Sequence, residues 1–308
     1  MVIDDPPDAA QYIDPRVGVV VLTHNRADEV TRTLERLVAL PERPVIVVVD
    51  NGSSDGTAET VRRGFPAVTC IRLATNLGAA GRNIGVEACD RPYVALCDDD
   101  TWWDPGSLTH AADLLDAHPK IAVMTGKVLI RSERVDPTCL FMANSPLPAP
   151  PGFPGPSLLG FLAGASIVRR QAFLAVGGFE SRLFLGAEEE LLTLDLVSAG
   201  WALAYVDDLV IHHYPSPGRD AESRRRLLAR NSLWIAWLRR SPRSALARTL
   251  TVIRAGMHSR AAREALHEAA GGLAWVLANR RCVSPHLDRQ LRQLERAQSA
   301  RRHSSRWS

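Results

Sequence analysis

Residues 93–100 read Tyr-Val-Ala-Leu-Cys-Asp-Asp-Asp, an apolar run of strand length that ends in three consecutive carboxylates. An apolar run of this length predicts a strand that is buried on both faces of a sheet. The three acids repel one another, so we expect a cationic group beside them. Ligand sites of open α/β sheets lie at the carboxyl ends of strands, and carboxylate oxygens suit Mg²⁺ or Mn²⁺. The alternative is a solvated acidic turn before a helix that starts near Asp104.

The segments before residue 93 alternate between strand and helix patterns. Short runs rich in valine and isoleucine end in polar turns, and each is followed by a stretch with helical spacing. This β-α-β-α-β-α-β order predicts an α/β fold with a mostly parallel sheet and right-handed crossovers. Strands are expected at residues 17–22, 44–49 and 68–73, and helices at residues 27–40, 57–63 and 79–89.

The rest of the chain combines further strands with a helical end. A proline-rich stretch at residues 133–157 is a long irregular excursion, and such excursions are often functional in compact domains. We expect a disordered lead at residues 1–15, an α/β domain at 16–217 and a helical C-terminal appendage at 218–308. Within the later part, strands are expected at 161–169, 201–206 and 209–213, and helices at 105–117 and 188–198.

Charge is distributed unevenly along the 308 residues. Residues 219–308 hold 20 arginines and 6 acids, which gives a charge of +14. Because the net charge of the whole chain is +3, the other residues together carry −11. The basic end and its Trp234 and Trp237 leave three interpretations open. They are contact with an anionic membrane surface, an anionic acceptor, and docking of the tail onto the acidic body.

Cysteine usage and the absence of long apolar runs indicate a compartment. Five cysteines without a CxxC pair point to reduced thiols in a cytosolic protein, not to disulfides or a zinc site. The first residues lack the basic and apolar regions of a signal peptide. The longest apolar run is well short of the ~20 residues of a membrane-spanning helix. We predict a cytoplasmic protein without a transmembrane segment, with peripheral attachment to the inner face of the plasma membrane left open.

Four segments taken together resemble one protein family. They are residues 20–26 (Val-Val-Leu-Thr-His-Asn-Arg), 47–57 (Val-Val-Val-Asp-Asn-Gly-Ser-Ser-Asp-Gly-Thr), 76–83 (Asn-Leu-Gly-Ala-Ala-Gly-Arg-Asn) and the acid triplet. Their order and spacing resemble the family 2 glycosyltransferases of the GT-A fold, over about residues 17–215. The resemblance implies a Rossmann-like sheet flanked by helices, and a metal-dependent, inverting sugar transfer. It implies a nucleotide-diphosphate sugar donor, with UDP or dTDP favoured. The acceptor would be a hydroxyl on a glycan, a lipid-linked molecule or a small molecule, with no nucleic-acid partner.

The resemblance also implies roles for side chains at the strand ends. Asp50 would accept the imide N–H of a uracil or thymine base, although Asp50-Asn51-Gly52 is also an ordinary turn signal. Arg82 and Asn83 would face the diphosphate or the ribose. The full set implied for the nucleotide sugar is Thr23, Asn25, Arg26, Asp50, Asn76, Arg82, Asp98 and Asp99.

A metal site follows from the same resemblance. The triplet resembles the family's D-x-D motif, which implies that Asp100 binds a divalent ion, Mn²⁺ or Mg²⁺, directly. Asp98 would face the ribose or a metal-bound water. The segment at residues 210–213, Val-Ile-His-His, resembles the strand that supplies a metal-binding histidine in many members. His212 aligns best with that histidine, and His213 is the second candidate.

Residues 177–191 resemble the part of the family that carries the catalytic base. A Gly-Gly-Phe turn at 177–179 precedes three acids that open a helix, and Glu188 lies twelve residues before Gly200. This spacing implies that Glu189 is the base, at a position where the family has Asp, with Glu188 as the alternative. Acids in a first helical turn also stabilise the helix dipole, which is the non-catalytic explanation.

Other enzyme classes fit the sequence less well. A phosphatase of the haloacid dehalogenase class would need a small residue where Trp102 stands and a downstream lysine, but Lys120 and Lys127 come early. A nucleotidyltransferase would need a glycine-rich turn with a basic end at residues 23–26, and a dinucleotide dehydrogenase would need a G-x-G-x-x-G motif. The alternative function is a nucleotide-sugar-binding partner or scaffold subunit that has lost transfer. The sequence does not identify the sugar.

Overall fold

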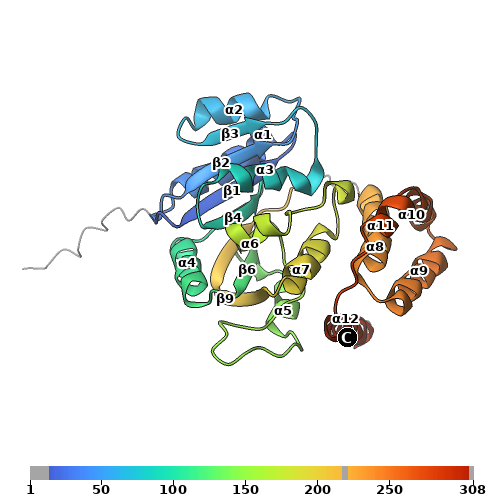
Figure 1. Cartoon of the computed structure of the whole chain (residues 1–308). Coiled ribbons are helices and arrows are strands. Elements are labelled where there is room, and N and C mark those ends of the chain that lie inside the picture. The colour runs from blue at the N-terminus through green and yellow to red at the C-terminus, as the bar shows by residue number, and fades with distance from the viewer. Residues whose placement is uncertain (1–13, 217–220, 305–308) are drawn as a thin grey trace, which may run out of the picture.

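The computed structural model describes residues 14–216 and 221–304, and within them nine strands form one sheet with helices packed around it (Figure 1). The strand order is β3-β2-β1-β4-β8-β6-β9-β5, and β7 pairs with β6. The expected lead at residues 1–15 lies outside the described residues, apart from its last two. The strands are β1 (Val17–Thr23), β2 (Val45–Asp50), β3 (Thr69–Arg72), β4 (Tyr93–Asp98), β5 (Thr101–Trp103), β6 (Ile121–Ile130), β7 (Arg134–Val135), β8 (Ala165–Arg169) and β9 (Ala202–His213).

Helices connect and cover these strands. The first three, and a short 3₁₀ turn, form the crossovers between the parallel strands, as the alternating sequence pattern predicts. The helices are α1 (Ala27–Val38), α2 (Thr57–Gly64), η1 (Gly78–Ala80), α3 (Gly81–Ala88), α4 (Ser107–Ala117), α5 (Pro137–Ala143), α6 (Arg170–Ala175), η2 (Ser181–Leu183), α7 (Glu188–Ser198), α8 (Ala221–Arg239), α9 (Pro242–Gly256), α10 (Arg260–Gly271), α11 (Leu273–Ala278) and α12 (Pro285–Ser304).

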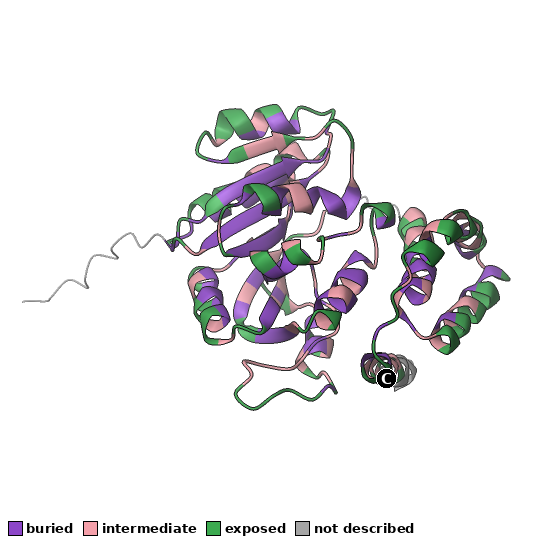
Figure 2. Cartoon of the chain, in the orientation of Figure 1, coloured by how far each residue is buried: buried purple, intermediate pink, exposed green. Residues whose placement is uncertain are grey.

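The first half of the sheet is parallel and its central strands are buried (Figure 2). β1 lies between β2 and β4, and its valines are almost completely shielded from solvent. In this register Thr23 pairs with Asp50, and Leu22 pairs with Asp98. The carboxyl ends of the three strands therefore meet at one edge of the sheet, where the polar segments of the sequence begin.

The second half of the sheet is mixed, which differs from the mostly parallel sheet that the sequence predicts. β8 runs antiparallel to both β4 and β6, because it follows the long excursion and not a crossover helix. The two strands expected at 201–206 and 209–213 are one strand, β9, with a register shift beside Gly126 and Lys127 of β6. The excursion at 133–157 contains β7 and α5.

The helices after residue 220 pack against the α/β body on the side of α7 (Figure 1). Leu191 and Leu194 of α7 share a buried apolar cluster with Ile235 of α8. Arg239 of α8 forms an ion pair with Asp195 of α7, with 2.5 Å between Nε and Oδ1. Docking of the basic end onto the acidic body is thereby confirmed. None of the described helices has the length and apolar character needed to cross a bilayer.

Candidate functional site

A cavity of about 420 Å³ opens at the carboxyl ends of β1, β2 and β4, and we call it the strand-end cavity. The loop before α7 and the first turns of α8 form the wall opposite the strand ends. Its lining combines polar and charged side chains from the strand ends with two adjacent glutamates. The residues that line it are Leu22, Thr23, His24, Arg26, Asn51, Asn76, Gly78, Ala79, Arg82, Asp98, Asp99, Ala163, Gly164, Phe184, Leu185, Glu188, Glu189, Ser223, Arg224 and Leu227.

Two arginines supply the positive charge that the acid triplet requires. Arg82 of α3 pairs with Asp98. Arg26 Nη1 lies 3.0 Å from Asp99 Oδ1 and 3.3 Å from Asp100 Oδ2. Burial raises the pKa of Asp99 to about 7, against the opposing effect of the Arg26 guanidinium. The triplet is therefore a charge-paired turn in which Asp99 and Asp100 are buried and Asp98 is half-buried, and not a solvated acidic surface.

Glycine allows α3 to bring Arg82 to this position. A Cβ atom on Gly85 would lie 2.4 Å from a methyl group of Val20, and one on Gly81 would lie 2.7 Å from a methyl group of Leu22. Because neither side chain is present, α3 packs directly on β1. Arg82 is 5% exposed and reaches Asp98 across the strand ends.

The residues implied for the nucleotide divide into two groups. Thr23, Arg26, Asn76, Arg82, Asp98 and Asp99 line the strand-end cavity, whereas Asn25 and Asp50 do not. Asn25 instead builds the loop, because its Oδ1 accepts a hydrogen bond from the backbone N–H of Ser54 at 2.8 Å. Asp50 is fully buried, and its Oδ1 accepts from the backbone N–H of Ser53 at 3.0 Å.

Asn83 has a structural role that differs from the implied contact with diphosphate or ribose. Its side chain exchanges two hydrogen bonds with the backbone of Phe179, each 2.9 Å long. A Cβ atom on Gly178, which has φ +66°, would lie 2.5 Å from the Asn83 Oδ1. Asn83 therefore fixes the Gly-Gly-Phe turn against α3.

The first turn of α7 presents two of its three acids to the strand-end cavity. Glu188 is 5% exposed and Glu189 is half-buried, and both line the cavity, whereas Glu190 does not. Burial raises the pKa of Glu189 to about 7, and repulsion from Glu188 acts in the same direction. Burial also raises the pKa of Glu188. Both candidates for the base therefore lie in the cavity, and a raised pKa is typical of general bases that act near neutrality.

Of the two candidate histidines of the implied metal site, the structure places His213 beside Asp100. His213 Nε2 lies 3.5 Å from Asp100 Oδ1, whereas His212 Nε2 lies 2.9 Å from Asp104 Oδ1. His212 also stacks on Trp102. Successive side chains of a strand point to opposite faces, so only one of the two histidines can face Asp100. Among the described residues, no group of three or more metal-ligating side chains is preassembled.

The carboxylate and the imidazole nevertheless fit a divalent ion. His213 Nε2 is buried and has no hydrogen-bond partner among the described residues. A buried ring nitrogen without a hydrogen-bond partner is uncommon, and a divalent ion beside Asp100 would satisfy it. Asp100 and His213 supply one oxygen-donor group and one nitrogen donor, a combination that suits Mn²⁺.

The loop that leads into α7 is held by a residue of α8. Asn231 is completely buried, and its Nδ2 lies within 3.1 Å of three carbonyl oxygens, those of Leu183, Leu185 and Gly186. These carbonyls directly precede the helix start at Glu188. The sequence shows Asn231 only as a polar residue in a helix, and nothing local in it indicates this contact.

Replacing Asn231 by alanine should therefore affect both stability and turnover. Buried carbonyl groups that lose their donor cost about 1–3 kcal/mol, which urea unfolding would measure. A displaced loop would also move Glu188 and Glu189, and we expect kcat to fall about 10- to 100-fold. Asn279→Ala is the matched control, because the Asn279 Nδ2 donates at 2.9 Å to Trp275 within its own exposed helical turn. Unchanged kcat in a destabilised Asn231→Ala would restrict Asn231 to a structural role.

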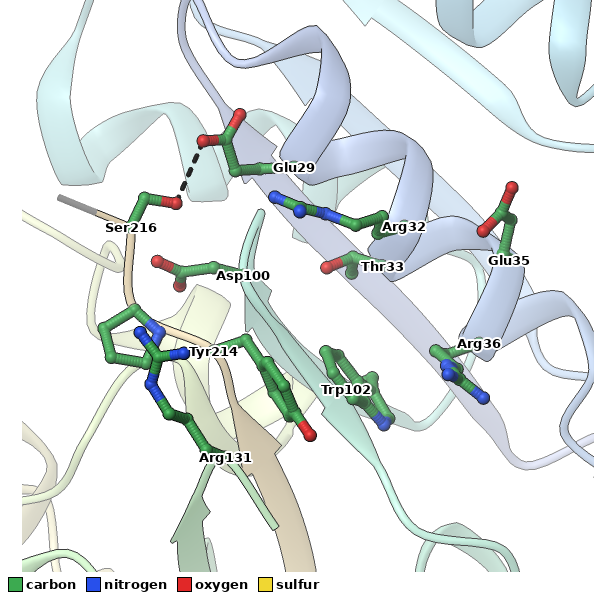
Figure 3. Close-up of a pocket in the computed structure, with 11 residues that line it drawn as sticks. Glu29, Arg32, Thr33, Glu35, Arg36, Asp100, Trp102, Arg131, Tyr214 and Ser216 are labelled. Carbon is green, nitrogen blue, oxygen red and sulfur yellow. Dashed lines mark hydrogen bonds between the residues drawn. The ribbon is translucent and has the colours of Figure 1, made fainter.

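A second cavity, of about 490 Å³, lies between α1, β5 and the end of β9 (Figure 3). We call it the α1–β5 cavity. It meets the acid triplet at Asp100, which lines it, while Asp98 and Asp99 line the strand-end cavity. Its wall carries three guanidinium groups and an aromatic pair, Trp102 and Tyr214, whose ring centroids are 5.0 Å apart. The residues that line it are Glu29, Arg32, Thr33, Glu35, Arg36, Asp100, Trp102, Arg131, Tyr214, Pro215 and Ser216.

Several lining residues of the strand-end cavity carry no sequence signal. Phe184, Leu185, Arg224 and Leu227 come from loops and helices that meet only in the folded chain. Gly164 is different, because a Cβ atom there would lie 2.7 Å from the Asp98 carboxylate. A glycine just before a strand is the one signal that could have indicated it.

Comparisons with known proteins agree with this geometry. The model of glycosyl transferase family 2 matches residues 18–175. The N-acetylglucosaminyl-diphospho-decaprenol L-rhamnosyltransferase of Mycobacterium tuberculosis is 30% identical over 241 residues, which cover 67% of this chain and 78% of the relative.

Two solved structures show the same fold. The mannosyltransferase PcManGT from Pyrobaculum calidifontis, in complex with GDP-Man and Mn²⁺, aligns with a TM-score of 0.56 at 19% identity, over 90% of this chain and 86% of that one. S. aureus TarS 1-349 in complex with UDP aligns with a TM-score of 0.54 at 23% identity, over 71% of this chain and 65% of that one. This chain therefore belongs to glycosyl transferase family 2 and is a glycosyltransferase with the GT-A fold.

Proposed function

We propose that this chain transfers a sugar, with inversion, from a nucleotide-diphosphate sugar to a hydroxyl of a lipid-linked or other glycan acceptor of the cell envelope. The observation that carries the proposal is that Arg82, Asp98 and the pair Glu188–Glu189 line one cavity. A guanidinium for the diphosphate and a carboxylate for the hydroxyl proton thus lie in the same space. We place transfer in residues 16–217, with residues 218–308 as a helical region that closes the site.

The donor would bind at the carboxyl ends of β1 and β2. Thr23 Oγ1 and Asp50 Oδ2 are neighbours in the sheet, and both are buried without a hydrogen-bond partner among the described residues. Arg72 Nε lies 3.7 Å from this Asp50 oxygen, which leaves it free of a direct hydrogen bond. This oxygen lies behind the cavity wall in the structure, so an imide N–H of uracil or thymine would reach it only if the wall residues move, and that contact would favour a UDP- or dTDP-linked donor. The TarS complexes contain UDP and UDP-GlcNAc and the PcManGT complex contains GDP-Man, so these neighbours support a nucleotide-diphosphate sugar without favouring one base.

A divalent ion, Mn²⁺ or Mg²⁺, would be held by Asp100 and His213. When bound, it would supply charge neutralisation for the departing diphosphate. Arg26 and Arg82 add positive charge at the same turn, and Asp98 would orient the ribose. The solved complex of PcManGT with GDP-Man and Mn²⁺ supports metal use in this fold.

Transfer needs one base and one leaving group. Glu189 would accept the proton of the acceptor hydroxyl while the hydroxyl oxygen bonds to the anomeric carbon. The bond between that carbon and the diphosphate oxygen breaks, and its electron pair leaves with the nucleoside diphosphate. Glu188, beside Glu189, keeps the pKa of the base high and so makes it a better proton acceptor once it is ionised.

The α1–β5 cavity is the position we assign to the anionic part of the acceptor, while its reacting hydroxyl would lie in the strand-end cavity beside Glu189. Guanidinium groups bind phosphate oxygens, and an exposed aromatic face packs on sugar rings. Arg32, Arg131 and the Trp102–Tyr214 pair supply both kinds of contact next to Asp100. An acceptor that carries a sugar on a diphosphate fits this chemistry, and the relative from Mycobacterium tuberculosis is named for such an acceptor. Trp103, by contrast, is part of the buried core.

A panel of donors tests the function directly. With Mn²⁺ present, UDP- or dTDP-sugars should raise the melting temperature more than GDP-sugars, because a bound ligand stabilises the folded state by mass action. Release of nucleoside diphosphate should then require an acceptor, and an acceptor with a diphosphate should be used better than its dephosphorylated form. Donor binding without turnover of any acceptor would favour the alternative function, a nucleotide-sugar-binding partner or scaffold subunit.

A further inference from the structure

One face of α9 carries four large apolar side chains that the described chain leaves exposed. Leu246, Leu250, Ile253 and Met257 have exposed fractions of 53%, 44%, 47% and 66%. They are spaced i, i+4, i+7 and i+11, so they form one continuous stripe along the helix and its C-cap residue. We call this set the α9 stripe. At about 1.5 Å per residue it is roughly 16 Å long.

A different face of α9, about 110° around the helix from the stripe, is packed against other helices. Ala245, Val252 and Gly256 are buried there, and α9 contacts both α8 and α10. In Figure 1 α9 lies at the outer end of the helical region, and in Figure 2 most of it is coloured as exposed. The α9 stripe is therefore not an internal surface of this fold.

The charges of α9 are all positive. Residues Pro242–Gly256 include three arginines and no acid. Arg248 pairs with Glu295 of α12, but Arg243 and Arg254 are exposed and form no ion pair within the part of the chain that the structure describes. At 100° per residue both lie on the same flank of the α9 stripe. An apolar stripe flanked by arginines is the pattern of a helix that lies in a membrane interface.

We propose that the α9 stripe inserts into the interface of a lipid bilayer that contains anionic lipids, with Arg243 and Arg254 at the lipid phosphates. The net positive charge of α9 complements such a surface. A second copy of this chain fits less well, because a standard protein interface uses about 20–30 residues on each side and the stripe offers four. The inference deepens the proposed function, on which its biological meaning rests, since a lipid-linked acceptor is presented at a bilayer.

The α9 stripe differs from the membrane contact that the sequence indicates, which is the helix with Trp234 and Trp237. Trp234 of α8 is 9% exposed, and its ring packs edge-on against Trp275 with centroids 5.5 Å apart. Trp237 donates a hydrogen bond to the Thr249 hydroxyl at 3.0 Å. Both tryptophans thus make contacts within the helical region, and we assign the lipid contact to the apolar residues of the α9 stripe.

Flotation with vesicles of phosphatidylcholine and phosphatidylglycerol tests the inference. The double variant Leu250→Ser with Ile253→Ser should weaken binding at least about tenfold, because membrane affinity scales with buried apolar area. Leu140→Ser is the matched control, since Leu140 lies on α5 and has an exposed fraction of 54%, against 44% for Leu250 and 47% for Ile253. Arg243→Gln with Arg254→Gln should weaken binding about tenfold on these vesicles and leave binding to pure phosphatidylcholine unchanged.

Three results would overturn the inference. Wild-type protein could fail to float, the α9 variants could float as well as Leu140→Ser, or the α9 variants could convert a dimer to a monomer in light scattering without changing flotation. Transfer to a water-soluble acceptor should be normal in all α9 variants. If wild-type protein floats through α9 but transfers no sugar, the proposed function fails while the membrane surface stands.

Discussion

Glu189→Gln is expected to lower kcat by about 10²- to 10⁴-fold, the usual contribution of a general base, while leaving donor affinity unchanged. Glutamine keeps the size of the side chain and removes only its ability to accept the proton. Donor binding depends on the strand ends and the metal, and neither needs this carboxylate. Transfer rates with saturating donor and acceptor, together with donor affinity from a thermal shift series, measure the two effects separately.

The pH profile gives this prediction a second, independent readout. Because burial and Glu188 raise the pKa of Glu189 to about 7, Glu189 is protonated below that pH and cannot act as a base. The kcat of the wild-type enzyme should therefore fall as pH falls through about 7. Glu188→Gln removes a neighbouring negative charge, so its acid limb should move to lower pH while turnover at high pH is retained.

The two variants also decide between the glutamates. If Glu188→Gln loses turnover and Glu189→Gln does not, Glu188 is the base and the alignment of the family motif is shifted by one residue. If both variants remain active, the base lies outside α7. Glu190→Gln is the control on the same helix turn, because Glu190 does not line the strand-end cavity.

Asp100→Asn should abolish the Mn²⁺ dependence of donor binding and weaken metal-dependent donor affinity by at least about 100-fold. Changes in the outer shell of a metal site already cost about 10- to 100-fold, and this substitution removes a direct ligand. The fold should survive, because Arg26 keeps its ion pair with Asp99, 3.0 Å away. Titration of UDP in the presence and absence of Mn²⁺, followed by melting temperature, measures the effect.

The paired histidines supply an internal control for the metal site. His213→Ala should weaken the response to Mn²⁺, whereas His212→Ala should leave it unchanged, because His212 contacts Asp104 and Trp102. If His212→Ala weakens the response to Mn²⁺ and His213→Ala does not, then His212 and not His213 faces the ion when the metal is bound. An unchanged Mn²⁺ response in Asp100→Asn would remove Asp100 from the site.

Much of the α/β fold and one edge of the site could be predicted from the sequence. Apolar strands that alternate with amphipathic helices determine a parallel arrangement, and parallel strands bring their carboxyl ends to one edge. Thr23 and Asp98 follow from that rule, because each is the last residue of a strand, whereas Arg82 lies in the first turn of α3 and was implied by the family resemblance. Glu188 and Glu189 were predicted from the spacing of a family motif, and both line the cavity.

Only the tertiary structure decided which histidine faces Asp100, how the α7 loop is held and which face of the helical end is exposed. The pairing of β6 with β9 has a register shift, because Gly126 pairs with Val206 and the next residue, Lys127, pairs with Val210. The alternation of side chains along β9 before this shift therefore does not determine which faces His212 and His213 occupy. The contact of Asn231 with residues 183–186 joins segments that are about 45 residues apart in sequence. The α9 stripe has the same helical spacing as a buried face, and periodicity alone cannot distinguish a face that meets another helix from one that meets solvent or lipid. These features depend on long-range packing, which local sequence patterns do not encode.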